Sequence, residues 1–374
     1  MFILYPFPET LPIAKARGVQ VVNITHSLAR QGCRLDLLHT GQDNAAIYQH
    51  YGIDPIPGFN PISISGSVRL LGLEFKSNKI FNIRMSRYID SLDKKPDLFI
   101  ARHLKTAYHL LRHHSDIPLL YDAHEIFTES TTNPNNKSNL LKMESYTLNH
   151  AAYITAISEA LAKDITQTYG INRPIDIVRT ATTFPESIPK KDWSHPEKHI
   201  IYAGSLYGWK GVDDIIKAGK YLDDNVLIKI IGGEKQQIEE LKKELGPHQK
   251  KFEFIPFLPH EKIQEQLSGA CIAILPNNPG SVSQWTSPLK LFEYLANGCA
   301  IISTDIPTIR EIISESEALF YTSGRPEQLA ERIREYTTNP QRAKPTGLHN
   351  YELAPQHSWD ARARQILDIT RNNK

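Results

Sequence analysis

Short apolar segments alternate with amphipathic segments along almost the whole chain. In the first half the apolar segments predict strands at Phe2–Tyr5, Arg34–Thr40, Asp97–Arg102, Leu119–Ala123, Tyr153–Ile157 and Ile175–Thr180. A helix is predicted from about Val19 to Gln31, because its apolar residues fall largely on one side. This alternation is typical of α/β layers around parallel sheets.

The same pattern restarts in the second half. It predicts strands at His199–Ala203, Val226–Ile231, Phe252–Phe254, Cys271–Leu275 and Ala300–Ser303, and helices near Asp213–Lys220, Lys235–Leu245, Glu261–Ser268 and Ser358–Ile369. A polar, proline-rich segment between the halves is typical of an interdomain linker. Because 374 residues exceed one ordinary core, we expect an N-terminal domain (1–185), a linker (186–197), a C-terminal domain (198–355) and a C-terminal helix (356–374).

Composition narrows the class of protein. A net charge of +2 gives no general case for nucleic-acid binding. Cys33, Cys271 and Cys299 lie far apart without metal-binding spacing, which indicates a reducing compartment. No apolar run approaches the roughly 20 residues needed to cross a bilayer, and the N-terminus lacks the layout of a signal peptide. We therefore expect a cytoplasmic protein, or one held at the inner face of a membrane.

One segment in the second half reads as a loop that becomes a helix at an anion site. Ser287 suits the N-cap and Pro288 the first helical turn. The N–H groups of Leu289 and Lys290 would then point outward at the positive end of the helix dipole. Glu293, three residues after Lys290, could accept hydrogen bonds from sugar hydroxyls. A diphosphate with a ribose attached would satisfy all of these groups.

Three further loops follow predicted strands in the same half. The first carries Gly204 and Ser205 and runs to Lys210 and Gly211; glycines allow close approach to an anion, and the lysine adds charge. Taken alone it is more typical of an ordinary β–α connection, and it lacks the P-loop spacing, but together with Lys290 it favours a shared diphosphate site. The pair Gly232-Gly233 could belong to a ligand-binding loop or to a tight turn. Backbone groups near Phe257 and Leu258 could meet a nucleobase edge.

In the first half, a predicted strand ends in Asp122-Ala123-His124-Glu125. A histidine there could orient a sugar hydroxyl or share a proton, or it could simply be satisfied by nearby backbone. A metal at Asp122 and His124 lacks further ligands at suitable spacing. Arg17, near the N-terminus, could face an anionic phosphate or lie solvated at the surface.

The region 68–95 is basic, with apolar residues interleaved among Arg69, Lys76, Lys79, Arg84, Arg87, Lys94 and Lys95. It could contact an anionic membrane surface or an anionic acceptor. The alternative is a solvated helix face over core residues.

The motifs resemble those of the retaining glycosyltransferases of family 4. The resemblance rests on Gly204 with Lys210-Gly211, on Gly232-Gly233, on Phe257-Leu258, and on the run from Ser287 to Ala296. Asp122-Ala123-His124-Glu125, Ile157-Ser158-Glu159 and Ser358-Trp359 are also similar. The resemblance spans nearly the whole chain and is most specific over residues 200–305.

The resemblance implies the GT-B architecture, an α/β fold of two Rossmann-like domains whose parallel sheets face a central cleft. It implies a nucleotide-sugar donor bound mainly by the second domain and a glycan or lipid-linked acceptor bound by the first. Lys210 and Lys290 would neutralise the diphosphate, Glu293 would hold the ribose and His124 would contact the transferring sugar. No metal cofactor is expected, because lysines and helix N–H groups supply the positive charge. The last helix would return to brace the first domain.

Two departures from the family pattern concern the donor. Many members carry a glutamate eight residues before the one at Glu293, where this chain has Trp285. An arginine that often follows the first glycine is Ser205 here. Sugar recognition would then fall to Gln284, Thr286, Trp285 or backbone groups.

The sequence therefore predicts a retaining, metal-independent glycosyltransferase in cell-surface polysaccharide or glycolipid assembly. Two alternatives are a nucleotide-sugar epimerase of the same architecture and a non-catalytic nucleotide-sugar binding protein. The Ser287–Glu293 pattern argues against the epimerase. Because Trp285 and Ser205 depart from the family pattern, the non-catalytic binding protein remains an alternative.

Overall fold

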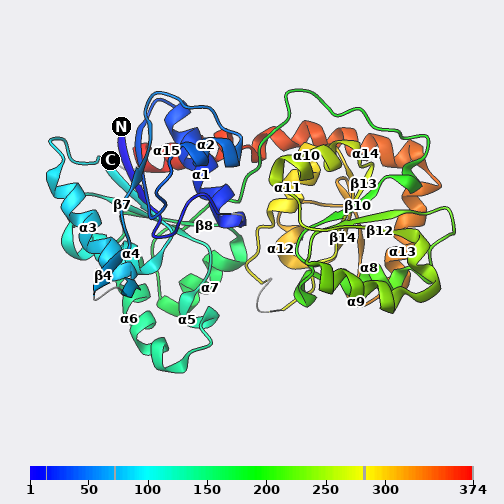
Figure 1. Cartoon of the computed structure of the whole chain (residues 1–374), viewed down its shortest axis with the longest axis horizontal. Coiled ribbons are helices and arrows are strands. Elements are labelled where there is room, and N and C mark those ends of the chain that lie inside the picture. The colour runs from blue at the N-terminus through cyan, green and yellow to red at the C-terminus, as the bar shows by residue number, and fades with distance from the viewer. Residues whose placement is uncertain (14, 71–72, 281–283, 373–374) are drawn as a thin grey trace. The chain divides into compact units, whose positions relative to one another are not determined.

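The computed structural model describes residues 1–13, 15–70, 73–280 and 284–372, and these form two compact units. Unit 1 comprises Met1–Arg179 and the C-terminal segment from Trp359, whereas unit 2 comprises Thr180–Ser358. The last helix of the chain, drawn in red in Figure 1, therefore belongs to the same unit as the blue N-terminal elements.

Unit 1 is built around a parallel sheet with the strand order β3-β2-β1-β6-β7-β8-β9 in its described part. Its strands are β1 (Phe2–Pro6), β2 (Arg34–His39), β3 (Phe59–Ser63), β6 (Leu98–Ala101), β7 (Leu119–Ala123), β8 (Tyr153–Ala156) and β9 (Asp176–Ile177). All residues of β1, β6 and β7 are buried, as expected where helices cover both faces of a parallel sheet. An antiparallel hairpin, β4 (Ser67–Leu70) and β5 (Leu73–Lys76), stands apart from this sheet.

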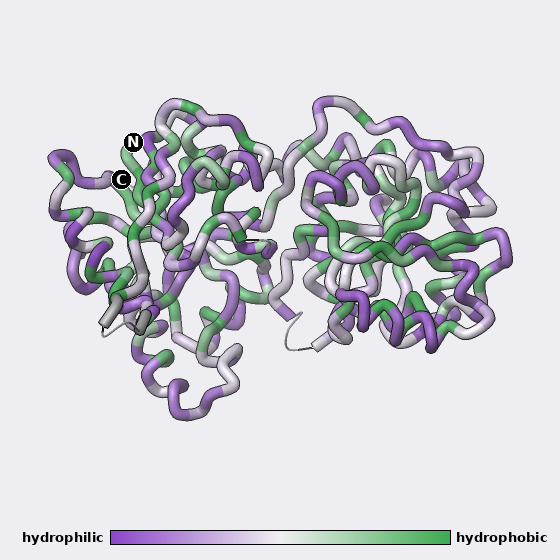
Figure 2. The backbone as a smooth tube through the Cα atoms, in the orientation of Figure 1, coloured by the Kyte–Doolittle hydropathy of each residue, from purple (hydrophilic) through white to green (hydrophobic). Residues whose placement is uncertain are grey.

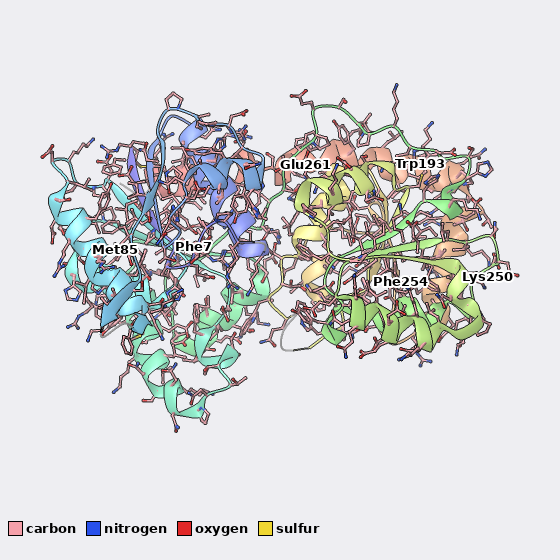
Figure 3. The ribbon with its side chains drawn as sticks, in the orientation of Figure 1. Phe7, Met85, Trp193, Lys250, Phe254 and Glu261 are labelled. Carbon is pink, nitrogen blue, oxygen red and sulfur yellow. The ribbon has the colours of Figure 1, made fainter. Side chains whose placement is uncertain are left out.

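The helices of unit 1 are α1 (Ala16–Arg30), α2 (Ala45–Tyr51), α3 (Asn78–Ser91), α4 (Leu104–His113), α5 (Phe127–Ser130), α6 (Pro134–His150), α7 (Glu159–Tyr169) and α15 (Trp359–Asn372). Helix α15 packs beside α1, where Arg30 and Asp360 form an ion pair at 2.7 Å (Figure 1). Met85 of α3 and Phe7, just after β1, are buried in the unit (Figure 3).

Unit 2 repeats the design with the strand order β12-β11-β10-β13-β14-β15, again parallel. Its strands are β10 (Ile200–Ala203), β11 (Ile228–Ile231), β12 (Phe252–Ile255), β13 (Ile272–Leu275), β14 (Ala300–Thr304) and β15 (Ala318–Tyr321). The chain moves outward from β10 to β12 and then restarts at β13 on the other side. Ligands of such sheets bind outside the carboxyl ends of the strands at this switch point.

The helices of unit 2 are α8 (Val212–Ala218), α9 (Lys235–Leu245), α10 (His260–Gly269), α11 (Leu289–Ala296), α12 (Pro307–Arg310), α13 (Pro326–Thr337) and α14 (Pro340–Leu353), with short 3-10 turns η1 (Pro196–Lys198), η2 (Gly208–Lys210), η3 (Gly246–Lys251) and η4 (Ala354–His357). Alternate strand residues enter different cores: Ile200 and Tyr202 pack with α8 and α13, whereas Ile201 and Ala203 pack with α10 and α11. The hydrophobic stretches in Figure 2 accordingly concentrate in the strands.

Residues 186–197, predicted as a linker, belong to unit 2 and are held against it. The Lys191 ammonium group donates to the carbonyls of Leu267, Ser268 and Ala270 at the end of α10. A cation at a helix C-terminus is favourable because the last carbonyls lack helical partners. Trp193 packs against the unit 2 core (Figure 3). The proline-rich composition predicted a linker, but composition alone could not predict these contacts of Lys191 and Trp193.

The strands and helices predicted from periodicity are confirmed, most with end shifts of one to three residues; β7 and α9 match at both ends. Strands β3, β4, β5 and β15 were not predicted. The apolar pattern of β3 is interrupted by Asn60 and Pro61, whereas β15 is a short apolar run, Ala318–Tyr321, that was overlooked.

Candidate active site

The carboxyl edge of the unit 2 sheet is formed by closely interlocked loops. Gly204 follows β10 with φ +155°, and a Cβ there would occupy the space of the Lys290 ammonium group. Gly232 follows β11 with φ +130°, and a Cβ there would overlap the Gly204 carbonyl. Both positions therefore require glycine, which brings backbone against the side chain of Lys290.

Lys290 is held at this edge by an aromatic side chain. Its Nζ donates to the Tyr202 hydroxyl at 3.0 Å and lies 4.1 Å from the centre of the Tyr202 ring. The Tyr202 hydroxyl in turn donates to the Ser205 carbonyl at 2.8 Å. Tyr202 thus connects the lysine to the loop that follows β10.

Ser287 does not cap α11, so this part of the sequence prediction is wrong. The helix begins at Leu289 with Pro288 at the N-cap, and no side chain caps it. The Ser287 hydroxyl instead accepts a hydrogen bond from the Thr180 N–H at 3.0 Å. This leaves the first N–H groups of α11 without a side-chain cap, and such groups are favourable partners for an anion.

A second lysine shares the environment of the first. Lys210 ends η2, and its Nζ lies 3.7 Å from the centre of the Trp209 ring. Burial lowers the pKa of Lys210 to about 8. Burial, and then the charge of Lys210, lower the pKa of Lys290 well below its usual value. Among the described residues, neither ammonium group has a carboxylate within ion-pair distance, so the two cations repel one another in a partly desolvated place.

Glu293 lies one helical turn after Lys290 and is buried. The side chain of Gln264 of α10 donates to its Oε1 at 3.4 Å, and the Asn297 side chain donates to the side-chain Oε1 of Gln264 at 3.0 Å. Burial raises the pKa of Glu293 to about 7, although the charge of Lys290 lowers it. The carboxyl group thus changes charge near neutral pH.

In unit 1, the carboxyl end of β7 carries a fully paired network. Asp122 is buried; its Oδ1 accepts from the Thr155 hydroxyl at 2.9 Å, and its Oδ2 lies 3.0 Å from His124 Nε2. Arg362 of α15 donates to both carboxylate oxygens, at 3.0 and 2.8 Å. Burial alone would raise the pKa of Asp122, but the charge of Arg362 and the hydrogen bond with His124 hold it well below its usual value.

His124 is kept neutral by its surroundings. Burial, and then the charge of Arg102, lower its pKa to about 4, although Asp122 opposes both. Arg102 directly follows β6 and donates to the Gln20 side chain at 2.9 Å. A neutral imidazole beside an ionised carboxylate can exchange hydrogen bonds with a hydroxyl group.

Family models match both halves of the sequence. The model described as "Glycosyl transferases group 1" matches residues 183–372, and "Glycosyltransferase Family 4" matches residues 18–182. The first covers more than half of the chain. The chain belongs to the glycosyl transferases group 1.

Solved structures of glycosyltransferases share the fold. Sucrose-phosphate synthase from Thermosynechococcus elongatus matches with a TM-score of 0.74 and 15% identity, covering 99% of this chain and 98% of that one. Anabaena HepE in complex with UDP-glucose matches with a TM-score of 0.69 and 15% identity over the whole of both chains. WaaG, a glycosyltransferase involved in lipopolysaccharide biosynthesis, has a TM-score of 0.67 at 14% identity, covering 99% of both chains. No curated protein matches the sequence. The predicted GT-B class, with two Rossmann-like units, is confirmed.

The residues predicted to contact the donor sugar of this glycosyltransferase differ in their exposure to solvent. Gln284 is exposed and Thr286 half-buried, but the Trp285 side chain is only 6% exposed. Trp285 therefore contributes mainly to packing in this structure, in contrast to the acidic residue that many family members carry there.

The other predicted residues of this glycosyltransferase occupy strand ends. Phe257, after β12, is 62% exposed, and its N–H donates to the Gly233 carbonyl at 3.3 Å. Leu258 packs against the core of unit 2. In unit 1, Glu125 is half-buried, and Arg17 forms an ion pair with Glu9 at 2.6 Å.

Sequence reasoning missed several residues that hold this enzyme's candidate groups in place. Arg362 is the clearest, because 240 residues separate it from its partner Asp122. Tyr202, Gln264 and Arg102 were also missed. Only Tyr202 and Arg102 left a signal, as polar residues at the ends of predicted strands.

The described residues lack two further features. No group of three or more His, Cys, Asp or Glu could hold a metal ion. No helix in the described ranges is long and apolar enough to cross a membrane.

Proposed function

We propose that this protein transfers a sugar from a nucleoside diphosphate sugar to an acceptor hydroxyl with retention of configuration, in cell-surface polysaccharide or glycolipid assembly. The observation that carries the proposal is the pair Lys210 and Lys290. Two desolvated cations that repel each other beside Gly204 need a multivalent anion to neutralise them.

A nucleoside diphosphate matches the remaining groups of this edge. The uncapped first turn of α11 favours phosphate oxygens, and the buried Glu293 can accept hydrogen bonds from a ribose. The exposed ring of Phe257 offers a face to a nucleobase. HepE, which shares the fold, has been solved with UDP and with UDP-glucose, in line with this ligand class.

In the reaction we propose, the bond from the sugar to the diphosphate breaks as the acceptor oxygen bonds to the same face of the sugar. The acceptor proton passes to an oxygen of the departing phosphate. Lys210, Lys290 and the helix N–H groups would stabilise the negative charge that develops there, so that no metal is required. His124 would contact the transferring sugar.

Recognition of the sugar itself would differ from the common family pattern. Trp285 and Ser205 replace the usual acidic and basic residues, so we assign sugar contacts to Gln284, Thr286 and neighbouring backbone. Position 285 is buried, and burying an unpaired charge is costly. The new carboxylate in Trp285→Glu would therefore have to turn out of this site to contact a sugar.

We also propose that unit 1 contacts an anionic membrane surface or acceptor through a small part of the region 68–95. Lys79, Ile83 and Arg87 form one exposed stripe on α3, and Phe75 of β5 is 52% exposed. Arg84 and Lys95 instead donate to backbone carbonyls of the unit, and the exposed Lys94 lies 3.9 Å from the Asp97 carboxylate. Leu71 lies outside the described residues, and the side chains of Arg69, Leu70, Leu73 and Glu74 are not described.

Cosedimentation with anionic and with neutral vesicles tests the membrane contact. We expect binding to the anionic vesicles alone, weakening as salt screens the charges, and further weakened by Lys79→Glu with Arg87→Glu. Lys220→Glu, an exposed change in unit 2, serves as the control. Absence of binding at low salt would remove this proposal.

The activity is tested by measuring nucleoside diphosphate release from a panel of donor sugars, with and without acceptors. Release that depends on an acceptor, with retained configuration in the product, supports transfer. A second candidate, a non-catalytic nucleotide-sugar binding protein, is favoured by the buried Trp285. Donor binding without turnover across a broad acceptor panel would select it, whereas acceptor-independent conversion of the donor sugar would indicate an epimerase.

A further inference from the structure

Arg362 is buried at the end of the chain with a complete set of partners. Its side chain is only 5% exposed. One terminal nitrogen donates to both oxygens of Asp122, and the other donates to the carbonyls of Val178 and Arg179. These charge-assisted hydrogen bonds from one nitrogen to both oxygens hold the carboxylate in place and favour its ionised form.

The ionised carboxylate determines which nitrogen of His124 carries the proton. An ionised Asp122 carboxylate has no hydrogen to donate and can only act as an acceptor. The 3.0 Å contact therefore places a hydrogen on His124 Nε2. Because the imidazole is neutral, its Nδ1 then carries a lone pair. His124 would therefore accept a hydrogen bond at Nδ1 from a hydroxyl group.

The charged groups around His124 come from several elements. Asp122 lies on β7, Arg102 follows β6 and Arg362 lies on α15. Tyr5 of β1 lies among the same charges, and burial raises the pKa of its hydroxyl, so that it stays neutral. Asp122 is the only one of these groups that favours protonation of His124; both arginines oppose it.

We propose that Arg362 is a positioning residue for the transfer reaction: through Asp122 it fixes the tautomer of His124, so that Nδ1 faces the substrate as an acceptor. This inference rests on the proposed function only in assigning His124 to the transferring sugar. It gives the C-terminal helix a chemical role in addition to its packing in unit 1.

The chain offers a matched control for a purely structural role of α15. Arg30 of α1 pairs with Asp360 of α15 at 2.7 Å, and both side chains are partly exposed. This ion pair also joins α15 to unit 1, but it does not touch Asp122. Arg30→Gln should therefore leave the tautomer and titration of His124, and the turnover, unchanged.

The first test reads the tautomer directly in substrate-free protein by nitrogen-15 NMR of the histidine rings, with His124 assigned from His124→Gln. Wild type should carry the proton on Nε2. Asp122→Asn places an amide that can donate at this position, so the proton should move to Nδ1. It should also lower kcat on the order of 100-fold, the effect of a misoriented catalytic contact, with a donor KM within about threefold of wild type.

The second test changes the arginine. In Arg362→Gln, the pH at which His124 titrates should rise, because a nearby cation is removed and the carboxylate keeps its charge. The kcat should fall and its acidic limb should move upward with the titration, whereas Arg362→Lys should restore part of both. An Arg362→Gln protein with unchanged His124 titration and unchanged kcat overturns the inference.

Two outcomes separate this inference from others. Should Arg362→Gln fail to fold, Asp122→Asn decides: it preserves shape and leaves Arg362 two carbonyl partners, so an unchanged tautomer there overturns the inference. Should wild type transfer no sugar from any donor, the proposed function fails. The NMR tautomer and its response to Arg362→Gln would still support or overturn the positioning role.

Discussion

The two candidate regions differ in whether their buried charged side chains have partners of opposite charge. At the unit 2 sheet edge, Lys210 and Lys290 repel one another and have no paired carboxylate in the described structure. At the unit 1 sheet edge, Asp122 is fully paired with Arg362, Thr155 and His124. The first arrangement becomes favourable when an anion binds, whereas the second is complete without a ligand. A charged ligand is thus expected at unit 2, and a preset hydrogen-bonding group at unit 1.

The largest effect on stability is expected in unit 1. Removing the guanidinium in Arg362→Ala leaves Asp122 as a buried unpaired charge, which costs about 3–5 kcal/mol in unfolding free energy. Urea denaturation followed by fluorescence measures this loss. A stability equal to that of Arg30→Ala would show that the buried pair adds no more than an exposed one.

Lys290→Ala should change catalysis much more than stability, the reverse of what is expected for Arg362→Ala. Removing a desolvated and repelled cation should leave stability unchanged or slightly higher, while transition-state stabilisation falls by about 3 kcal/mol, on the order of 100-fold in kcat/KM. The same denaturation assay and donor turnover measure both, with the exposed Lys217→Ala as control. Wild-type turnover in Lys290→Ala would remove this lysine from the site.

Gly204→Ala tests the position of Lys290 without removing its charge. The added Cβ would displace the lysine from its place, and φ +155° is strained for alanine, so stability should fall by about 1–2 kcal/mol. The kcat/KM should fall roughly tenfold, about 1.4 kcal/mol in transition-state stabilisation. Gly208→Ala is the matched control in the same loop, because a Cβ there meets no atom within 4 Å. Equal kinetics for the two variants would argue that the lysine position is unimportant.

Glu293→Gln should have the smallest effect. A neutral amide in place of the carboxylate should weaken nucleoside diphosphate binding about tenfold, near the 1.5 kcal/mol of a hydrogen bond to a charged group. Because the pKa of Glu293 is about 7, the difference from wild type should be largest above pH 7, where the carboxylate is ionised, and should shrink below it. Calorimetric titration at pH 6 and pH 8 measures this; a difference independent of pH would contradict a role for the ionised group.

Local patterns predicted the layers and the lysines but not their partners. Periodicity located β7, α9 and most other elements because each is decided by residues close in sequence. The motifs of Gly204 and Lys290 could each be recognised because each lies at a strand or helix end, but their closeness is seen only in the structure. Arg362 with Asp122 could not be found in this way, since only the folded chain brings α15 to β7.

One local prediction failed because of a distant group. Ser287 has the residue type of an N-cap, but its hydroxyl accepts from the Thr180 amide, 107 residues away. The composition of 186–197 likewise gave no sign that Lys191 donates to the carbonyls at the end of α10. Neither partner is visible to a local pattern.

Proton uptake on binding a nucleoside diphosphate tests the account of the unit 2 lysines most directly. At pH 8 the terminal phosphate, with a pKa of about 6, and Glu293 are already ionised, whereas burial lowers the pKa values of Lys210 and Lys290, so we expect these lysines to take up protons when an anion binds. Calorimetry of the tightest-binding nucleoside diphosphate in buffers of different ionisation enthalpy should show net proton uptake, reduced in Lys290→Ala. Binding without proton uptake, or with equal uptake in wild type and Lys290→Ala, would contradict it.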